Sequence, residues 1–590
     1  SGAVTLNSDL LAKQGGTNFT NSLLVGTSST GTLSSATGNT GVGTSVLAAL
    51  TSGDRNTAIG IESMNDITTG ADNVAVGNNS LDETTTGTNN TAVGGYSLSE
   101  NTTASGNTAV GNVSLYCNTT GANNTAVGFC SLRANTTADK NTAVGYSSLL
   151  VNTTGTRNTA VGFCSLQANT TGDDNTAFGT ESLRANTTGA NNVAVGKNAL
   201  VANTTGDENT AVGCNTLGAN TTADNNTAIG AFALDTNTEG HSNVAVGRSA
   251  LTANTTADHN TAVGFSALDT NTTGAHNVAV GSRAGDANTT GTQNTFVGGD
   301  YNGGPGGANT TGGCNTFIGN DSGMKNTTGS FSTSVGAESS CNGTTSHSNA
   351  ALGYKALKLL TTGNSNVAIG REAMISNTTG GASIGVGAYA LQNNTTGCSH
   401  VAIGLQALED STTGENNVAI GRTAAKDVTT GTKNIMVGFN SGSNATTGTG
   451  NVLIGDSAGT DAVRNVTTGS NNIVLGNNAS ATAHIKIDWT VTSDLRDKTE
   501  VKNVTHGLDF VNQITPIEYR FKKSRENDTP TGNKKYGFKA QEILALEGDN
   551  PIIINNDDTD NLKLTSAHLI PVLVNAIKEL KAEIELLKNK

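Results

Sequence analysis

The stretch NTAVGFCSLQANTTGDD occupies residues 158–174, and NTAFGTESLRANTTGAN follows it directly at residues 175–191. Each stretch is one unit of a 17-residue repeat. The motif Asn-Thr/Val-Ala-Val/Ile-Gly recurs with this spacing in 27 turns between residues 22 and 476, and only two steps, from 294 to 315 and from 451 to 472, are longer. So strict a period predicts a repeated structural unit rather than a disordered chain.

Two positions of the repeat are constant when the asparagine is counted as position 1. Position 5 is glycine in every turn, and position 4 is always apolar. Position 9 is Leu or Met in the 14 turns that begin at residues 39 through 260. An unbroken glycine column needs a positive φ or a place without room for a Cβ, and we expect both.

The period is too short for a helical hairpin and fits one coil of a parallel β-solenoid or β-roll. We expect short strands at positions 2–5 and 8–11, turns around Asn-Thr-Thr-Gly, and a thin core of Val/Ile, Leu and some Ala. Because so thin a coil gains stability by association, we predict three chains around an axis that buries the Ala/Gly edge. The fold class is therefore an all-β repeat shaft in a homotrimeric fibre.

Composition limits the partners of the chain. The 590 residues carry a net charge of −14, of which residues 1–492 contribute −13. An acidic, charge-poor body is a poor non-specific ligand for nucleic acid, and no apolar run reaches the roughly 18 residues of a membrane span. We expect no nucleic-acid partner, no membrane insertion, no signal peptide and no cofactor. The seven cysteines lack a CxxC pair and are interpreted as free apolar fillers.

Two patterns in the repeats have a functional interpretation and a structural one. Acidic and histidine residues before the strand, among them Asp173, Asp207 and His259, have the oxygen ligands that Ca²⁺ prefers, but a solvated corner is the commoner explanation. No metal is predicted. The Asn-Thr-Thr triplets match the N-glycosylation pattern, but we interpret them as turns.

The repeat stops after Gly476, and charged residues then make up 31 of the last 98 positions. We divide the chain into a lead-in or cap at 1–21, the shaft at 22–476, a junction at 477–492 and an α-rich domain at 493–590. Apolar residues with alternating spacings of three and four predict a coiled coil at 569–588, and the shaft favours three strands. These residues are Ile570, Leu573, Ile577, Leu580, Ile584 and Leu587.

Four segments after the shaft carry a family resemblance: SDLRDK (493–498), HGLDFVNQITPIEYRFK (506–522), YGFKAQEI (536–543) and LIPVLVNAIKELKAEIELL (569–587). Together they resemble the intramolecular chaperone domain of the S74 peptidase family, found at the C-terminus of phage tail fibres and tailspikes. The repeat motif is similar to the SVAIG-type repeats of trimeric autotransporter adhesin heads, which are left-handed parallel β-rolls. The resemblance implies a chaperone that trimerises the fibre and then cuts itself off.

Carried over to this sequence, the catalytic pair of the S74 family is Ser493 as nucleophile and Lys498 as base. Asp494 and Arg496 also match the family motif and are assigned a supporting role. The bond expected to be cleaved is Thr492–Ser493. A desolvated lysine loses its proton more easily and can activate a serine hydroxyl. The alternative is that Ser493 and Asp494 only cap a helix while Lys498 is solvated.

The resemblance implies a structural tail fibre or spike of a phage virion, made in the host cytoplasm and joined to other tail proteins. Asp300, Tyr301 and Asn302, in the Gly-rich insertion at 298–313, are candidates for contact with a glycan or protein receptor on the host surface. The alternative is a loop that the shaft tolerates and that has no binding role. Any enzymatic activity would be at most a single-turnover self-cleavage. The alternatives are a bacterial cell-surface trimeric adhesin and a capsule-degrading tailspike enzyme, which would need paired carboxylates.

A uniform stack also poses a problem of alignment. Coils that repeat so regularly can slip past those of another chain by one turn with little change in contacts. We therefore expect a trimeric clamp at 493–590 to fix the register of the shaft.

Overall fold

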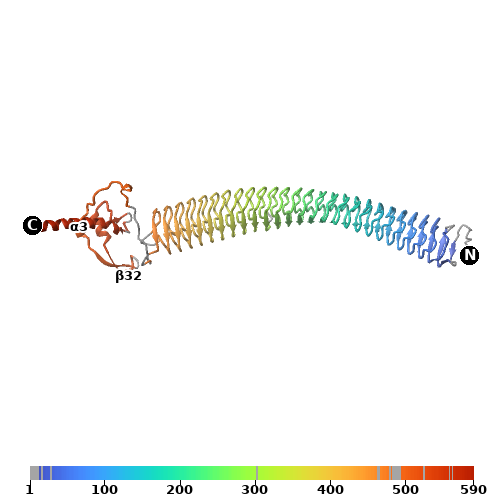
Figure 1. Cartoon of the computed structure of the whole chain (residues 1–590), viewed down its shortest axis with the longest axis horizontal. Helices are drawn as coiled ribbons and strands as arrows, with labels where there is room; N and C mark the ends of the chain where they lie inside the picture. The colour runs from blue at the N-terminus through green and yellow to red at the C-terminus, as the bar shows by residue number, and fades with distance from the viewer. Residues whose placement is uncertain are drawn as a thin grey trace. The chain divides into compact units, whose positions relative to one another are not determined.

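The computed structural model describes residues 12–14, 18–26, 30–299, 303–460, 465–477, 480, 493–522, 525–556, 559–560 and 562–590. The chain divides into two compact units. The first comprises Ser1–Ile454 with Val466–Ile473, and the second comprises Gly455–Asn465 with Val474–Lys590. The first unit is a parallel β-solenoid and the second is a small region with few helices (Figure 1).

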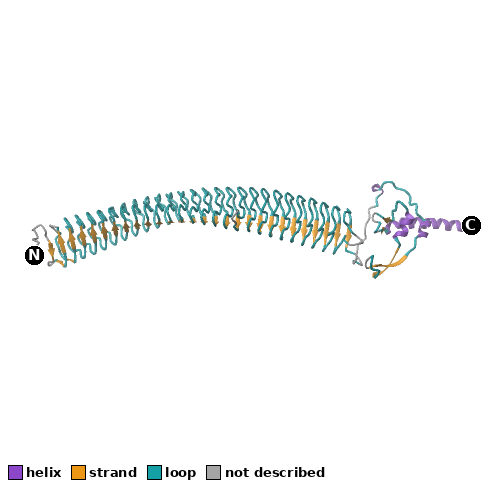
Figure 2. Ribbon diagram, turned by 180° about the vertical axis from the view of Figure 1, so that it is seen from behind, coloured by secondary structure: helices purple, strands orange, loops and turns teal. Residues whose placement is uncertain are grey.

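Each coil of the solenoid contributes one three-residue strand at positions 2–4, and these 27 strands form one parallel sheet. Figure 2 shows the strands along one side of the coils and the loops along the other. Neighbouring strands pair in register, so that Ala160 lies opposite Ala143 and Ala177. The strands are β3 (Leu23–Val25), β5 (Thr40–Val42), β6 (Thr57–Ile59), β7 (Val74–Val76), β8 (Thr91–Val93), β9 (Thr108–Val110), β10 (Thr125–Val127), β11 (Thr142–Val144), β12 (Thr159–Val161), β13 (Thr176–Phe178), β14 (Val193–Val195), β15 (Thr210–Val212), β16 (Thr227–Ile229), β17 (Val244–Val246), β18 (Thr261–Val263), β19 (Val278–Val280), β20 (Thr295–Val297), β21 (Thr316–Ile318), β22 (Thr333–Val335), β23 (Ala350–Leu352), β24 (Val367–Ile369), β25 (Ile384–Val386), β26 (Val401–Ile403), β27 (Val418–Ile420), β28 (Ile435–Val437), β29 (Val452–Ile454) and β30 (Ile473–Leu475).

The first coil is covered by residues from the predicted lead-in. Strand β1 (Ala12–Gln14) pairs antiparallel with β3, and β2 (Phe19–Thr20) pairs with β4 (Ala36–Thr37). The Phe19 side chain is buried. Strand β1 thus occupies an edge whose N–H and C=O groups would otherwise be open to another chain.

The predicted second strand at positions 8–11 is wrong, because this part of each coil is a turn. In the coil at 158–174, Cys164 and Leu166 have φ values of 52° and 49°. These left-handed values recur at positions 7 and 9 along the shaft and are incompatible with an extended strand. The backbone is still paired from coil to coil, since the Leu166 N–H donates to the Ser182 carbonyl at 2.9 Å.

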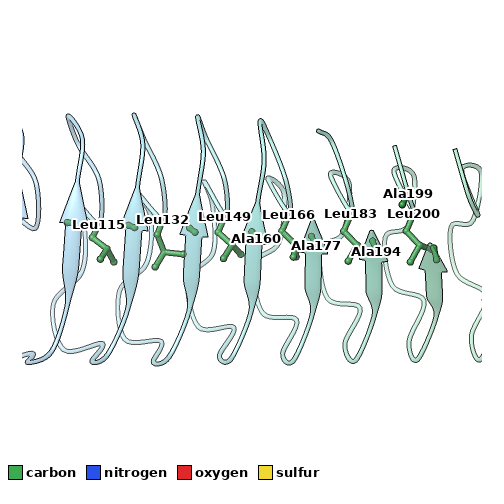
Figure 3. Close-up of a cluster of buried hydrophobic side chains, with 14 of the residues drawn as sticks. Leu115, Leu132, Leu149, Ala160, Leu166, Ala177, Leu183, Ala194, Ala199 and Leu200 are labelled. Carbon is green, nitrogen blue, oxygen red and sulfur yellow. The ribbon is translucent and has the colours of Figure 1, made fainter. Parts of the chain in front are cut away.

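The core lies between position 3 of the strand and position 9 of the turn. Ala160 and Leu166 are fully buried, and Figure 3 shows the stacked Leu and Ala side chains inside successive coils. The Val/Ile column at position 4 points outward instead, so its predicted place in the core is wrong. The Ala column cannot form the edge between chains either, because alanine is enclosed by its own coil.

Two asparagine columns hydrogen-bond along the inside of the stack. At position 1, the Asn158 N–H donates to Asn141 Oδ1 at 2.9 Å. At position 12, Asn169 Nδ2 donates to Asn152 Oδ1 at 2.8 Å. The amide groups of Asn158 and Asn169 both donate to the Gly172 carbonyl, at 2.8 and 3.0 Å. The asparagines of the Asn-Thr-Thr triplets are therefore buried structural groups, which agrees with their interpretation as turns.

The glycine column at position 5 meets both expected conditions. Gly162 has a φ of 142°, and a Cβ there would collide with the Gly179 carbonyl oxygen of the next coil. The same arrangement links each glycine of this column to the next through most of the shaft.

In the coils that begin at residues 294, 315 and 434, the interruption of the Leu column is an exchange of large and small core residues. At position 3, Phe296 and Phe317 replace alanine and are buried. Gly323 stands at position 9 of the second coil, and Gly306 takes the equivalent place in the first, which is four residues longer; a Cβ at either glycine would collide with a phenylalanine ring. Met436 at position 3 faces a glycine in the same way in the coil that begins at residue 434. In these three coils the larger residue at position 3 thus compensates for the smaller one opposite it.

One coil has a histidine in the inner asparagine column. His400 is fully buried, and the Asn417 N–H donates to its Nδ1 at 3.3 Å. Burial lowers the pKa of His400 to about 4, and contacts with backbone groups of Gly414 and Asn417 oppose that shift only in part. The folded shaft therefore favours the neutral imidazole.

We expect His400 to make the shaft acid-sensitive. Because its folded pKa of about 4 lies below the unfolded value of 6.5, the stabilisation is present above pH 6.5 and is lost as the pH falls toward 4. The loss amounts to about 3 kcal/mol per chain. Thermal unfolding between pH 7 and 4 should show this loss in the wild type and a smaller one in His400→Asn, the residue usual at this position. Equal acid sensitivity of the two proteins would contradict the assignment.

The second unit contains three α-helices and two hairpins among its described residues. Its core is formed by Phe510, Ile543, Ile553, Ile554, Leu569 and Val572. Its elements are the 3-10 helix η1 (Leu495–Asp497), α1 (Leu508–Gln513), β31 (Ile517–Lys522), β32 (Pro530–Gly537), α2 (Ala540–Glu547), β33 (Ile554–Asn555), β34 (Lys563–Leu564) and α3 (Ser566–Lys588). No helix in the described part of the chain combines the length and apolarity of a membrane span.

Candidate functional site

The segment at 493–498 folds into a single turn of helix. Asp494 caps η1, since its Oδ1 accepts the Arg496 N–H at 2.9 Å. The Arg496 side chain turns back onto the same carboxylate, with Nε 3.1 Å from Oδ1. These hydrogen bonds lower the pKa of the Asp494 carboxyl and raise that of the Arg496 guanidinium. The pair fixes the turn that carries the two predicted catalytic residues.

The turn brings Ser493 and Lys498 together. Lys498 Nζ lies 2.8 Å from Ser493 Oγ, and the Lys498 N–H donates to the Leu495 carbonyl at 3.1 Å. A nucleophile within hydrogen-bond reach of a lysine is the geometry that a serine–lysine dyad requires. Both side chains are exposed. A lysine acts as a base only after it loses its proton, and removal from water favours that loss. The exposed position of the pair in the single chain does not provide this removal from water.

The alternative interpretation, in which Ser493 and Asp494 only cap a helix, is correct for Asp494 alone. Asp494 does cap a short helix, but Ser493 does not cap it and instead contacts Lys498. Thr492, on the other side of the bond expected to be cleaved, lies outside the described residues. The position of cleavage therefore stays a prediction.

The comparisons with known proteins agree with this part of the chain. Residues 493–549 match the family model described as the chaperone of endosialidase, Peptidase_S74. These residues form a chaperone-of-endosialidase domain. No curated protein and no solved structure matches the chain. A chaperone of this family next to a long β-solenoid of 17-residue coils is consistent with a phage tail fibre or tailspike.

The family match ends at residue 549, before α3, but contacts tie α3 to the matched part. The Glu579 carboxylate accepts the Leu508 N–H at 2.6 Å, and Asn575 Nδ2 donates to the His506 carbonyl at 3.0 Å. Gly507 leaves room for Glu579, since a Cβ there would collide with the carboxylate. Sequence reasoning missed these residues, because Glu579 lies far along the chain from its partner at the start of α1.

Glu547 is a second acceptor that the sequence analysis did not single out. Its carboxylate accepts the backbone N–H groups of Ile552, Ile553 and Ile554 at 2.8, 2.7 and 2.9 Å. It thereby shapes the loop between α2 and β33. A glutamate at the end of a helix gives no sequence signal for such a role.

The other candidates on the shaft have a structural explanation or lie outside the described residues. Acidic residues at position 16 bind the backbone of the preceding coil, as when Asp173 Oδ1 accepts the Thr156 N–H at 2.6 Å and Asp207 Oδ1 the Ala190 N–H at 2.7 Å. The ring of His259 stacks on that of a neighbouring histidine at 5.0 Å. The seven cysteines are unpaired. The receptor candidates Asp300, Tyr301 and Asn302 are not among the described residues.

Proposed function

We propose that the chain is the shaft of a trimeric phage tail fibre or tailspike, assembled by its own C-terminal chaperone. The observation that carries the proposal is the chaperone-of-endosialidase match at 493–549, next to 27 near-identical coils. Trimerisation is the function that this family implies. Repeating coils need an external guide because neighbouring registers have nearly equal energies.

Helix α3 has the uncovered face that a trimerising helix needs. Leu569 and Val572 pack into the core of the second unit, and Ala576 on the same helix is buried. The predicted heptad seam faces away from that core, and Ile577 and Leu587 are 65% and 70% exposed. A row of exposed Ile and Leu at alternating spacings of three and four favours association with copies of the same helix. A three-stranded coiled coil at 569–588 is therefore part of the proposal.

Self-cleavage at Thr492–Ser493 is the proposed last step of assembly. The 2.8 Å contact between Ser493 and Lys498 supports it. The exposure of both side chains supports a cut that waits until another surface covers them, since desolvation is what converts the lysine to a base. Release of the chaperone would then leave a shaft that cannot exchange its chains, which makes assembly irreversible.

Host attachment through the insertion at 298–313 completes the proposal. Adhesin and depolymerase remain the alternatives. The depolymerase alternative has little support in the shaft, because acidic side chains such as Asp173 and Asp174 already bind neighbouring backbone or basic groups. Glycan hydrolysis by the purified shaft would favour the enzyme over the structural fibre.

Separate production of the shaft tests the chaperone role. We expect residues 1–492 alone to yield little soluble trimer, since no clamp sets their register, whereas the full chain and its Ser493→Ala variant assemble. Sedimentation and resistance to protease measure the difference. If the isolated shaft assembled as completely as the full chain, the chaperone function would have to be abandoned.

A further inference from the structure

The outer face of the solenoid sheet is uniform along the shaft. We call the side chains at positions 2 and 4 of the 27 strands the strand face. Position 4 is always Val, Ile, Leu or Phe, and position 2 is always Thr, Val, Ile, Ala or Leu. None of these 54 side chains is charged, and none is buried. An apolar column that the chain maintains in every coil, yet leaves outside its own core, requires another explanation.

The area of this face is that of a protein–protein interface. Val42, Ile59 and Ile454 are 40–41% exposed. A fully exposed Val or Ile side chain corresponds to roughly 60–120 Å² of apolar surface, so about 40% exposure leaves roughly 25–50 Å² per coil at position 4. Position 4 is exposed in 12 of the 27 coils and half-buried in the others. The 12 exposed side chains alone present roughly 300–600 Å², and the half-buried ones and the side chains at position 2 add to that area, against about 800 Å² per partner in a standard interface. Monomeric proteins rarely leave so large an apolar patch in water.

Charged residues mark the border of the strand face. Two residues beyond position 4, at position 6, stand Lys197, Arg248, Arg371, Arg422 and Asp456. The same column holds Phe129, Tyr146 and Phe163, whose rings stack at 5.5 and 5.3 Å and stay about half exposed. Charged groups are typical of an interface rim, whereas the absence of charge at positions 2 and 4 is typical of its centre, and exposed aromatic rings are enriched in interfaces as a whole.

The period of the strand face selects the partner. Any partner that covers it must present matching apolar groups at the rise of one coil, roughly 4.8 Å, for the whole length of the shaft. A parallel copy of the same solenoid has this rise by construction, and an unrelated globular protein does not. The partner is therefore this chain itself, as the chaperone domain also implies.

We propose that the shafts associate through the strand face, with positions 2 and 4 of three chains directed at a common axis. This inference rests on the proposed trimeric fibre and specifies the surface that builds it. The strand face replaces the Ala/Gly edge as the expected contact between chains, because the alanines at position 3 are enclosed by their own coil. It also gives position 4 its role: the column that never breaks is the core of the assembly rather than the core of the coil.

Photo-crosslinking of the full chain tests the orientation. Phe178 is a natural aromatic residue at position 4 and is 56% exposed, so benzoylphenylalanine should be tolerated there. Thr188, at position 14 of the same coil, is exposed and serves as the control. We expect crosslinked chains from position 178 and none from position 188. Crosslinks from 188 in a protein that sediments as a trimer would overturn this inference alone, and a wild-type monomer would overturn the fibre as well.

A charge placed on the strand face gives a second readout. Ile229→Asp would bring three carboxylates into the proposed axis, whereas Ala231→Asp, at position 6 of the same coil, would place them at the rim. We expect Ile229→Asp to lose shaft trimers and protease resistance, and Ala231→Asp to keep both. Equal behaviour of the two variants would contradict an apolar axis lined by position 4.

Discussion

Replacement of Gly162 by alanine is expected to prevent a protease-resistant shaft from forming. Gly162 has a φ of 142°, which costs an L-residue about 1–3 kcal/mol. In addition, the new Cβ would collide with the Gly179 carbonyl oxygen, a backbone atom held by the next coil. Relief requires the coils to separate, which breaks the hydrogen bonds between them. The total cost is comparable with the few kcal/mol by which domains are stable.

Gly303→Ala separates the two causes. Gly303 has a φ of 119°, but nothing lies within 4 Å of a Cβ built there. This variant therefore carries the backbone strain without the collision, and it should fold with a modest loss of thermal stability. Circular dichroism melting curves and limited proteolysis of the two variants measure the difference. A Gly162→Ala shaft as stable as Gly303→Ala would show that the coils are not pressed together at position 5.

The period and the glycine column are enough to predict the coil, but they do not decide which neighbour faces inward. Adjacent strand residues point to opposite faces, so Ala160 and Val161 cannot both be in the core. Hydrophobicity favours the valine. The interior of the coil nevertheless has room only for the smaller alanine, because Leu166 enters the same narrow space from the opposite turn. Where a phenylalanine stands in place of the alanine, a glycine replaces the leucine, which is a relation of volumes that a single residue column does not reveal.

The left-handed turn is another limit of sequence reasoning. Leu166 has a φ of 49°, a conformation that residues other than Gly, Asn and Asp rarely adopt. Local propensity therefore predicts an extended segment there. The left-handed conformation is stabilised by tertiary contacts, because the leucine fills the core and its N–H donates to the next coil. These contacts outweigh the local preference for an extended backbone.

At the candidate site, residues close in sequence were predictable and distant ones were not. Ser493, Asp494, Arg496 and Lys498 fall within six positions, and the spacing of a short turn is sufficient to bring them together. The carboxylate of Glu579 reaches the start of α1 only because α3 packs against it, and that packing depends on the whole domain.

Self-cleavage should depend completely on two side chains. In the proposed reaction, Ser493 Oγ attacks the Thr492 carbonyl carbon and passes its proton to Lys498 Nζ. The C–N bond then breaks as Lys498 Nζ returns that proton to the Ser493 nitrogen, which leaves as an amine, and the Thr492 acyl group remains as an ester on Ser493 Oγ. Water hydrolyses the ester and regenerates the hydroxyl. Wild-type protein should release a 98-residue fragment that begins Ser-Asp-Leu-Arg, and Ser493→Ala should release none.

Lys498→Arg distinguishes a base from a structural contact. An arginine keeps the positive charge and a donor for Ser493 Oγ, but it does not lose its proton in proteins. We therefore expect this variant to assemble normally and remain uncut, whereas a lysine that only orients the serine would be replaced by arginine with partial activity. Denaturing gels of boiled samples measure the fragment, and unboiled samples report the trimer. Cleavage of Lys498→Arg at the wild-type rate would exclude Lys498 as the base.

Because the pair is exposed in the single chain, we also expect the fragment to appear only after the trimer band. Cleavage that preceded assembly would remove the proposed link between the two steps.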